Sequence, residues 1–153
     1  MFNLVEGDLF DAKETYLVHQ CNVVTTHAAH LAQAVFKRYP WSDIYTGRQH
    51  HDVPGNILVR GNGKDRRFVV AMLGQYYPGF SRYAGKDGYG ARFAYFKCCL
   101  NDMTKLRGDF AFPWRIGCSA AGGKWEEYWE ALVRFEKFIA GNVTVYKLPG
   151  SSD

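Results

Sequence analysis

The stretch FPWRIGCSAAGGKWEEYW, residues 112–129, passes from an aromatic-rich segment through a run of small residues into an amphipathic pattern. Its first part belongs to a short apolar run, DFAFPW (109–114), which predicts a buried strand. The segment that follows the small residues, KWEEYWEALVRFEKFI (124–139), has apolar residues at helical spacing and predicts a helix. A strand, a glycine-rich turn and a helix in this order are typical of an α/β domain.

The N-terminal part of the chain predicts two strands and a helix. FNLV (2–5) predicts a short strand, and TYLVHQCN (15–22) is almost continuously apolar, which is typical of a strand covered on both faces. AAHLAQAVFKRYP (28–40) has apolar residues at helical spacing, with Thr26 as the expected N-cap and Pro40 as the stop.

The rest of the chain continues the alternation. PGNILVRG (54–61) and RFVVAMLGQ (67–75) predict the two strands of a hairpin. Tyr76–Tyr89 predicts a long surface loop, ARFAYFKCCLNDMTKL (91–106) a helix, and NVTVYKL (142–148) a last strand. We therefore expect an α/β domain whose helices cover a mixed or mostly parallel sheet.

The composition fits one domain. The chain has 153 residues, 47% of them hydrophobic, which is enough for one sizeable core. A net charge of +4 suits an anionic ligand as well as nucleic acid, and we interpret the basic cluster KDRR (64–67) as a solvated loop. Without a signal peptide or a long apolar run, we expect a soluble, cytoplasmic or nucleo-cytoplasmic protein that does not contact membranes.

The cysteines and histidines do not predict a metal site. The cysteines have the spacing of neither a disulfide framework nor a CxxC pair: Cys21, Cys98, Cys99 and Cys118. His27 and His30 are three residues apart and can share one face of a helix, but the sequence supplies no third ligand beside them. We expect reduced thiols, no metal and no cofactor.

The small residues of the opening stretch predict an anion site. In α/β sheets ligands bind where strands end and helices begin, and the first amides of a helix have no partner within the helix. Small side chains let a phosphate reach such amides, so Gly117 to Gly123 is a candidate phosphate cradle. The alternative is a turn that uses glycine for geometry alone.

Six blocks of the chain resemble, in order and approximate spacing, the corresponding blocks of macrodomains. They are EGDLF (6–10), LVHQCN (17–22), LAQAVFKRYP (31–40), PGNILV (54–59), FPWRIGCSAAGGKWE (112–126) and VTVYKL (143–148). The resemblance is nearest the branch of terminal ADP-ribose protein glycohydrolase and ADP-ribose-1''-phosphate phosphatases. It implies a three-layer α/β/α fold around a mixed sheet, with residues 1–148 as a single macrodomain and 149–153 as a flexible tail.

The resemblance also implies a set of ligand-binding residues. Asp8 and Leu9 would lie at the adenine, Asn22 at the distal ribose, the glycine-rich loop around the diphosphate, and Tyr146 against the base. The full set is Asp8, Leu9, Asn22, Gly117, Cys118, Ser119, Ala120, Ala121, Gly122, Gly123 and Tyr146. The residues alone leave simpler roles open: a capping Asp, an Asn that closes a strand, and a core Tyr.

Two departures from the glycohydrolase branch bear on chemistry. Its catalytic Lys would stand at Gly74 or Gln75, and its catalytic Asp at Ala121, which argues against a lysine-based covalent mechanism. Hydrolysis would then use other groups as acid or base. The candidate catalytic residues are His19, which matches the HxCN of the phosphatase branch, and His27, His30 and Asp87.

Three functions stay open at this point. The first is hydrolysis of ADP-ribose-1''-phosphate or of ADP-ribose conjugates. The second is a non-catalytic reader or scavenger of ADP-ribose, which needs neither the Lys nor the Asp. The third is a weakly basic RNA-binding module, suggested by KDRR and the tyrosines. We expect a monomer whose partner is ADP-ribose or a derivative, free or carried by a protein or a nucleic acid.

Overall fold

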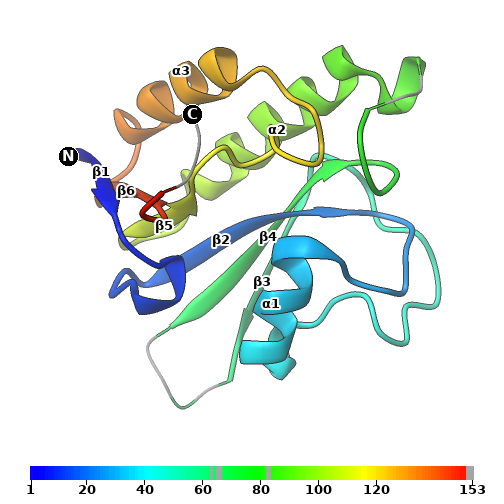
Figure 1. Ribbon diagram of the computed structural model, residues 1–153, viewed down its shortest axis with the longest axis horizontal. Helices are drawn as coiled ribbons and strands as arrows, with labels where there is room; N and C mark the ends of the chain where they lie inside the picture. The colour runs from blue at the N-terminus through cyan, green and yellow to red at the C-terminus, as the bar shows by residue number, and fades with distance from the viewer. Residues whose placement is uncertain (63, 65–66, 82–83, 151–153) are drawn as a thin grey trace.

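The computed structural model describes residues 1–62, 64, 67–81 and 84–150. Its centre is a six-stranded sheet in the order β1-β6-β5-β2-β4-β3 (Figure 1). The strands are β1 (Phe2–Glu6), β2 (Tyr16–Asn22), β3 (Ile57–Gly61), β4 (Phe68–Gln75), β5 (Phe110–Pro113) and β6 (Val143–Lys147). Neighbouring strands pair parallel except β3, which pairs antiparallel with β4 at one edge.

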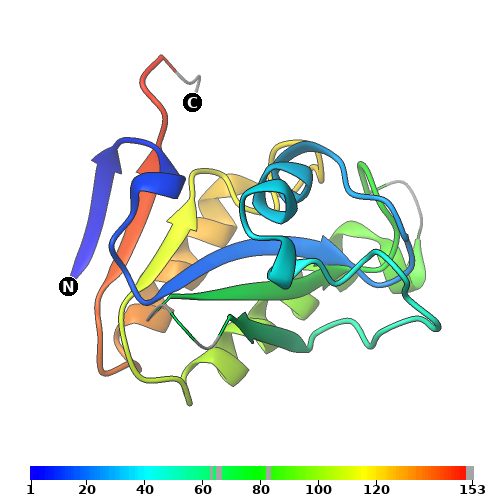
Figure 2. The ribbon, with the colours of Figure 1, turned by 90° about the horizontal axis from the view of Figure 1, so that it is seen from below.

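Helices cover both faces of this sheet. α1 (His30–Arg38) lies on one face, and α2 (Tyr89–Met103) and α3 (Trp125–Glu136) lie on the other (Figures 1 and 2). Short 3-10 turns follow β1, α1 and the segment after β4: η1 (Leu9–Asp11), η2 (Pro40–Ser42) and η3 (Gly85–Asp87). The predicted three-layer α/β/α fold around a mixed sheet is confirmed.

The central strand β2 separates two apolar cores. Tyr16 and Val18 belong to the core beneath α2 and α3, whereas Leu17 and Cys21 belong to the core beneath α1. Successive side chains of a strand point to opposite faces, so a strand buried on both faces reads as continuously apolar. The burial of both faces explains why TYLVHQCN is almost continuously apolar, and the predicted strand covered on both faces is confirmed.

Most predicted elements form near their predicted positions. The hairpin is confirmed by the antiparallel register of β3 and β4. The predicted cap at Thr26 is wrong: α1 begins at His30, and Ala29 is its N-cap residue, without a side-chain cap hydrogen bond. The reason lies in the preceding residues, because the Asn22 side chain binds the amides of Val24 and Thr25 and folds them into a loop.

Some predictions fall on residues outside the described part of the chain. They concern residues 65–66 of the basic cluster, residues 82–83 of the Tyr76–Tyr89 segment and residues 151–153 of the tail. The described part of the Tyr76–Tyr89 segment contains η3, and α2 begins at its last residue.

A cluster of aromatic rings lies where α3 meets the sheet. Trp114, which follows β5, lies 5.0 Å from Trp125 and 5.9 Å from Trp129 between ring centroids. Trp125 and Trp129 are 5.5 Å apart, and Trp129 meets the ring of Phe2 edge-on at 4.9 Å. These partly exposed rings join α3 to the β1 side of the sheet.

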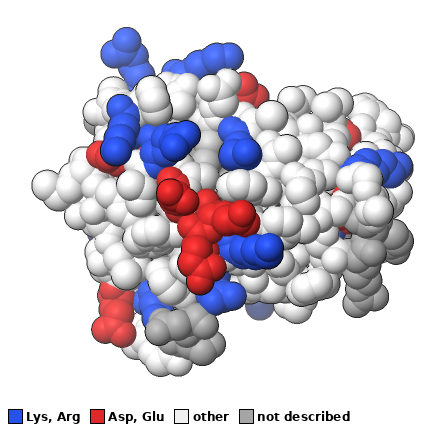
Figure 3. Space-filling model, turned by 90° about the horizontal axis from the view of Figure 1, so that it is seen from above, with Lys and Arg blue, Asp and Glu red and all other residues white. Residues whose placement is uncertain are grey.

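The outer surface over α2 and α3 carries charges of both signs. Figure 3 shows acidic side chains near the centre of this face, with Lys and Arg around them and large uncharged areas between. No extended basic patch is present among the described residues on this face. Among the residues that the structure describes, no helix has both the length and the apolar character needed to cross a membrane.

Candidate ligand-binding cavity

A cavity of about 770 Å³ lies at the carboxyl edge of the sheet. Each of the five mutually parallel strands contributes to its wall: Asp8 follows β1, Leu148 follows β6, Trp114 follows β5, Asn22 ends β2 and Gln75 ends β4. Ligands of open α/β sheets bind at this edge, and the volume falls within the range of about 300–1,000 Å³ usual for small-molecule sites.

One end of the cavity contains Asp8, Leu9 and Tyr146. One carboxylate oxygen of Asp8 accepts a hydrogen bond from the Phe10 amide at 2.9 Å and caps η1, so the simpler role of a capping residue is present. The Tyr146 hydroxyl donates to Glu14 Oε1 at 2.7 Å. Burial, followed by the Glu14 carboxylate, raises the pKa of Tyr146 to about 12, so this hydroxyl stays a donor at neutral pH.

Asn22 supports the first strand-to-helix loop of the cavity. Its Oδ1 accepts hydrogen bonds from the amides of Val24 and Thr25 at 3.0 and 2.9 Å, and from the Thr25 hydroxyl at 3.1 Å. The backbone N–H of Asn22 donates to the Tyr45 hydroxyl at 2.8 Å. Among the described residues no acceptor meets the side-chain nitrogen of Asn22, which leaves a donor for a ligand.

His27 and His30 are exposed and line the cavity from this same loop and from the start of α1. His30 has φ of +54°, a left-handed conformation that side chains other than glycine rarely adopt. Because no side chain caps α1, its first amides are available to an anion in the cavity. This wall therefore offers both imidazoles and the positive end of a helix dipole.

The second strand-to-helix loop forms the opposite wall. Its lining residues are Gly117, Cys118, Ser119, Ala120 and Ala121. The loop closes through the Gly123 amide, which donates to the Gly117 carbonyl at 2.9 Å. A Cβ on Gly117 would lie 2.6 Å from the Tyr128 ring, and one on Gly123 would lie 2.6 Å from the Gly117 oxygen. The glycines are thus required by packing, and the small side chains leave room beside the cavity.

His19 does not line the cavity. Its side chain is fully buried on the α1 side of β2, where it meets the ring of Phe36 edge-on at 5.4 Å. Burial lowers the pKa of His19 to about 4, so the imidazole is neutral at physiological pH. His19 is therefore packed in the interior beneath α1.

Asp87 does not line the cavity either. It is fully buried, and its carboxylate forms a bidentate pair with the guanidinium of Arg92 at 2.7 and 2.9 Å. Of the four candidate catalytic residues, the structure brings His27 and His30 to the cavity. Of the candidate ligand-binding residues, Gly122 and Gly123 shape the second loop without lining the cavity, and the others line it.

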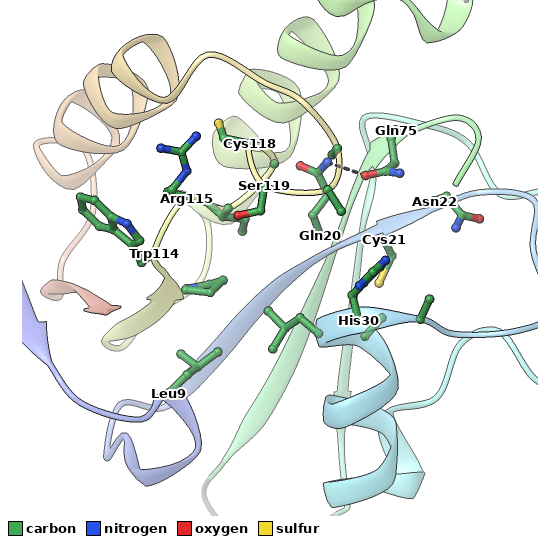
Figure 4. Close-up of a pocket in the computed structure, with 18 of the residues that line it drawn as sticks. Leu9, Gln20, Cys21, Asn22, His30, Gln75, Trp114, Arg115, Cys118 and Ser119 are labelled. Carbon is green, nitrogen blue, oxygen red and sulfur yellow. Dashed lines mark hydrogen bonds between the residues drawn. The ribbon is translucent and has the colours of Figure 1, made fainter. Parts of the chain in front are cut away.

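Gln20 and Gln75 are lining residues that the sequence did not assign to ligand binding. Gln20 Nε2 donates to Gln75 Oε1 at 2.7 Å (Figure 4). Gln75 Nε2 donates to the Tyr77 carbonyl at 2.9 Å. Gln20 Oε1 is buried and meets no donor among the described residues. A Cβ on Gly74 would lie 2.6 Å from this oxygen, so the glycine makes room for the amide pair.

Arg115 is a further lining residue that the sequence did not single out. It has φ of +61°, and among the described residues its guanidinium forms no hydrogen bond or ion pair. Its position could have pointed to it, because a guanidinium two residues before the candidate phosphate cradle Gly117 to Gly123 can reach an anion bound there. Figure 4 shows Arg115 and Ser119 on one side of the cavity and His30 on the other.

Comparisons with solved structures define the fold. The macrodomain of Mycobacterium tuberculosis DarG is 21% identical, with a TM-score of 0.75 over 95% of this chain and 97% of that one. The macrodomain of Thermus aquaticus DarG is 19% identical, with a TM-score of 0.72 over 96% and 98%. The chain has the macrodomain fold. Neither a protein-family model nor a curated protein matches this sequence.

One similar structure contains a ligand. Thermosipho africanus DarTG, solved in complex with ADP-ribose, is 16% identical to this chain, with a TM-score of 0.76. The match covers 99% of this chain and 42% of that one, so this chain spans about two fifths of the length of DarTG.

Proposed function

We propose that this macrodomain binds ADP-ribose or a close derivative in the cavity at the carboxyl edge of its sheet. The observation that carries the proposal is the joint contribution of five strand ends to one cavity, with a carboxylate at one end and two amide-rich loops at the other. The ADP-ribose complex of Thermosipho africanus DarTG, which has a similar fold, supports this assignment.

The parts of ADP-ribose have partners of suitable chemistry along the cavity. The free oxygen of Asp8 can accept from the adenine amino group, beside the apolar side chain of Leu9. The diphosphate would lie between the amides of the 117–121 loop and the start of α1. The distal ribose would then meet the unpaired side-chain nitrogen of Asn22, an amide donor that suits a sugar hydroxyl.

The finer proposal is hydrolysis at the distal end, of ADP-ribose-1''-phosphate or of an ADP-ribose conjugate. His27 and His30 are the titratable side chains of the first loop that line the cavity, and imidazoles can act as acid and base near neutral pH. One imidazole would take a proton from the attacking water, and the other would give a proton to the departing oxygen. Gln75 and Ala121 provide neither a nucleophile nor a carboxylate at the positions that the resemblance marks as catalytic.

A second candidate is a non-catalytic reader of ADP-ribose. Gln75 favours a reader, because its side-chain amide is hydrogen-bonded to Gln20 and to the Tyr77 carbonyl and cannot act as an acid or a base. Asp8, Asn22 and the 117–121 loop are sufficient for binding alone.

Calorimetric titration with ADP-ribose, ADP-ribose-1''-phosphate and NAD, followed by product analysis, separates these candidates. A hydrolase turns over at least one ADP-ribose substrate, and His27→Ala or His30→Ala abolishes turnover with little loss of binding. His50→Ala, an exposed histidine outside the cavity, is the matched control and keeps full turnover. Binding without any product from a panel of conjugates selects the reader, and no binding of ADP-ribose overturns the proposal.

A further inference from the structure

Arg92 and Asp87 form a buried ion pair behind the wall of the cavity. The Arg92 side chain is 2% exposed and that of Asp87 is 0% exposed. A guanidinium has five N–H donors, and here each has a partner. The partners are both Asp87 carboxylate oxygens and the carbonyl oxygens of Tyr77, Gly79 and Ala121, at 2.7 to 3.1 Å.

The three carbonyls belong to two segments that are distant in sequence. Tyr77 and Gly79 lie in the segment Tyr76–Ser81, which follows β4, and Ala121 lies in the glycine-rich loop 117–123. The Arg92 Nη1 atom joins the two, because it donates to Gly79 O at 2.7 Å and to Ala121 O at 3.1 Å. Both segments line the cavity, through Pro78 and Gly79 on one side and Ala121 on the other.

Asp87 extends the connection on the side of Tyr76–Ser81. Its Oδ1 accepts from the Tyr76 amide at 2.8 Å, and its backbone carbonyl accepts from the Ser81 hydroxyl at 2.9 Å. The Ser81 amide donates to the same Ala121 oxygen that Arg92 reaches, at 3.1 Å. The two segments are therefore joined at the Ala121 carbonyl, directly through the Ser81 amide and indirectly through Arg92.

The contacts require an arginine. A Lys ammonium has three donors on one atom and cannot form a planar bidentate pair with a carboxylate while it also reaches three carbonyls. Two buried charges are costly to desolvate, so such a pair contributes little to stability over an apolar replacement. The ion pair does, however, hold two cavity walls at a fixed separation, which an apolar pair of side chains does not do.

We propose that Arg92 is a positioning residue of this cavity, which with Asp87 fixes the separation of Tyr76–Ser81 and the 117–123 loop and thereby the affinity for the diphosphate-ribose part of the ligand. The proposal rests on the proposed binding of ADP-ribose. The adenine end, at Asp8 and Tyr146, has none of the contacts of Arg92 and stays unchanged when Arg92 is replaced.

The test compares ADP-ribose with adenosine, which lacks the phosphates, on the same variants. Arg92→Lys and the milder Asp87→Asn weaken ADP-ribose binding about tenfold or more, because the two cavity walls are no longer held in place before the ligand binds, and change adenosine binding less than about threefold. Met103→Ala is the matched control, a buried residue at the other end of the same helix α2, whose side chain forms no hydrogen bond to either segment among the described residues. It lowers Tm but leaves the ratio of the two affinities unchanged.

Amide hydrogen exchange supplies a readout that needs no ligand. In the Arg92 and Asp87 variants, exchange accelerates together in Tyr76–Ser81 and in the 117–123 loop, and in the control it does not. Acceleration in one segment only, or equal loss of ADP-ribose and adenosine affinity, overturns the proposal. If Arg92→Lys does not fold, Asp87→Asn decides, since Asn retains an acceptor for the Tyr76 amide. If the unaltered protein binds no ADP-ribose, the proposed function fails while the exchange result still decides this inference.

Discussion

The two strand-to-helix loops of the cavity are held in different ways. The first, residues 22–30 between β2 and α1, folds around one side chain, because Asn22 Oδ1 accepts three hydrogen bonds within it. The second, residues 114–124 between β5 and α3, folds through its backbone, with the Gly123 amide on the Gly117 carbonyl. The first loop presents exposed histidines to the cavity, and the second presents small residues from Gly117 to Ala121, after the larger side chains of Trp114 and Arg115.

The two loops contribute different groups to one site. A loop that is held by a side chain can carry other side chains on its exposed positions, so it supplies groups for chemistry. Where a loop is held by closely packed backbone, as at Gly117 and Gly123, it has no space for side chains and supplies amides and shape instead. Replacements that disturb the backbone-held loop should therefore cost more stability than replacements in the other.

The largest expected effect is that of Gly117→Ala in the second loop. The new methyl would lie 2.6 Å from the Tyr128 ring and 2.9 Å from Gln20 Oε1, at a φ of +75°. The steric and backbone costs together lower the free energy of unfolding by about 4 kcal/mol. Gly47→Ala, at φ of +78° with no atom within 4 Å of the new methyl, is the matched control and costs about 1 kcal/mol. Equal losses in urea unfolding would contradict the packing argument.

Acid should act on the half of the molecule that carries the first loop. All five histidines lie between residues 19 and 51, and His19 beneath α1 has its pKa lowered from 6.5 to about 4 by burial. Between these pH values the unfolded chain binds the proton and the folded chain does not, so stability falls as pH falls. The loss amounts to about 3 kcal/mol at pH 4 and below.

Urea unfolding from pH 7 to pH 4 measures this dependence. His19→Leu removes the titrating group and should show a shallower fall over the same range. If the unaltered protein and His19→Leu lose stability in parallel, the buried imidazole is not the cause.

Asn22→Ala tests the side chain that holds the first loop. Three hydrogen bonds are lost, and the expected decrease in the free energy of unfolding is about 2 kcal/mol. Asn22→Asp keeps the acceptor oxygen and should retain most of the stability, but it replaces the free donor with a negative charge. Calorimetry should therefore show weaker ADP-ribose binding for both variants, with loss of stability in Asn22→Ala alone.

The smallest expected effect is a gain in stability on relief of backbone strain. His30→Gly removes the cost of a left-handed conformation at φ of +54°, and Arg115→Gly removes the same cost at φ of +61° in the second loop. After the entropy that glycine adds to the unfolded chain, each should stabilise the fold by about 0.5 kcal/mol. Thermal unfolding that shows a lower Tm for both would indicate that the side chains make stabilising contacts.

The order and type of the elements followed from the sequence because the apolar spacing is local. The sequence did not show to which face of β2 each side chain points. Both faces are buried, so TYLVHQCN is apolar whichever face a given residue occupies. The start of α1 was misjudged at Thr26 because the loop closes on Asn22, a tertiary arrangement that local capping preference does not represent.

The candidate site was predictable where a motif is contiguous. Asp8, Asn22 and the 117–121 loop line one cavity, and the ligand-binding roles that the resemblance implies for them stay predictions. Arg92 could not be found, because it lies in an otherwise amphipathic helix pattern and its partners are mostly backbone carbonyls of residues 77, 79 and 121, which leave no sequence signal. Gln20 likewise acquires its place only through the parallel pairing of β2 with β4.

The aromatic cluster around Trp114 gives the molecule an internal optical probe. Three of the four tryptophans lie within 6 Å of a neighbour in this cluster, and only Trp114 among them lines the cavity. Excitation absorbed by Trp125 or Trp129 can pass to Trp114 over such short separations. Emission of the unlabelled protein should therefore respond to occupancy at one point of the cavity, while Trp41 beside Tyr39 contributes a constant background.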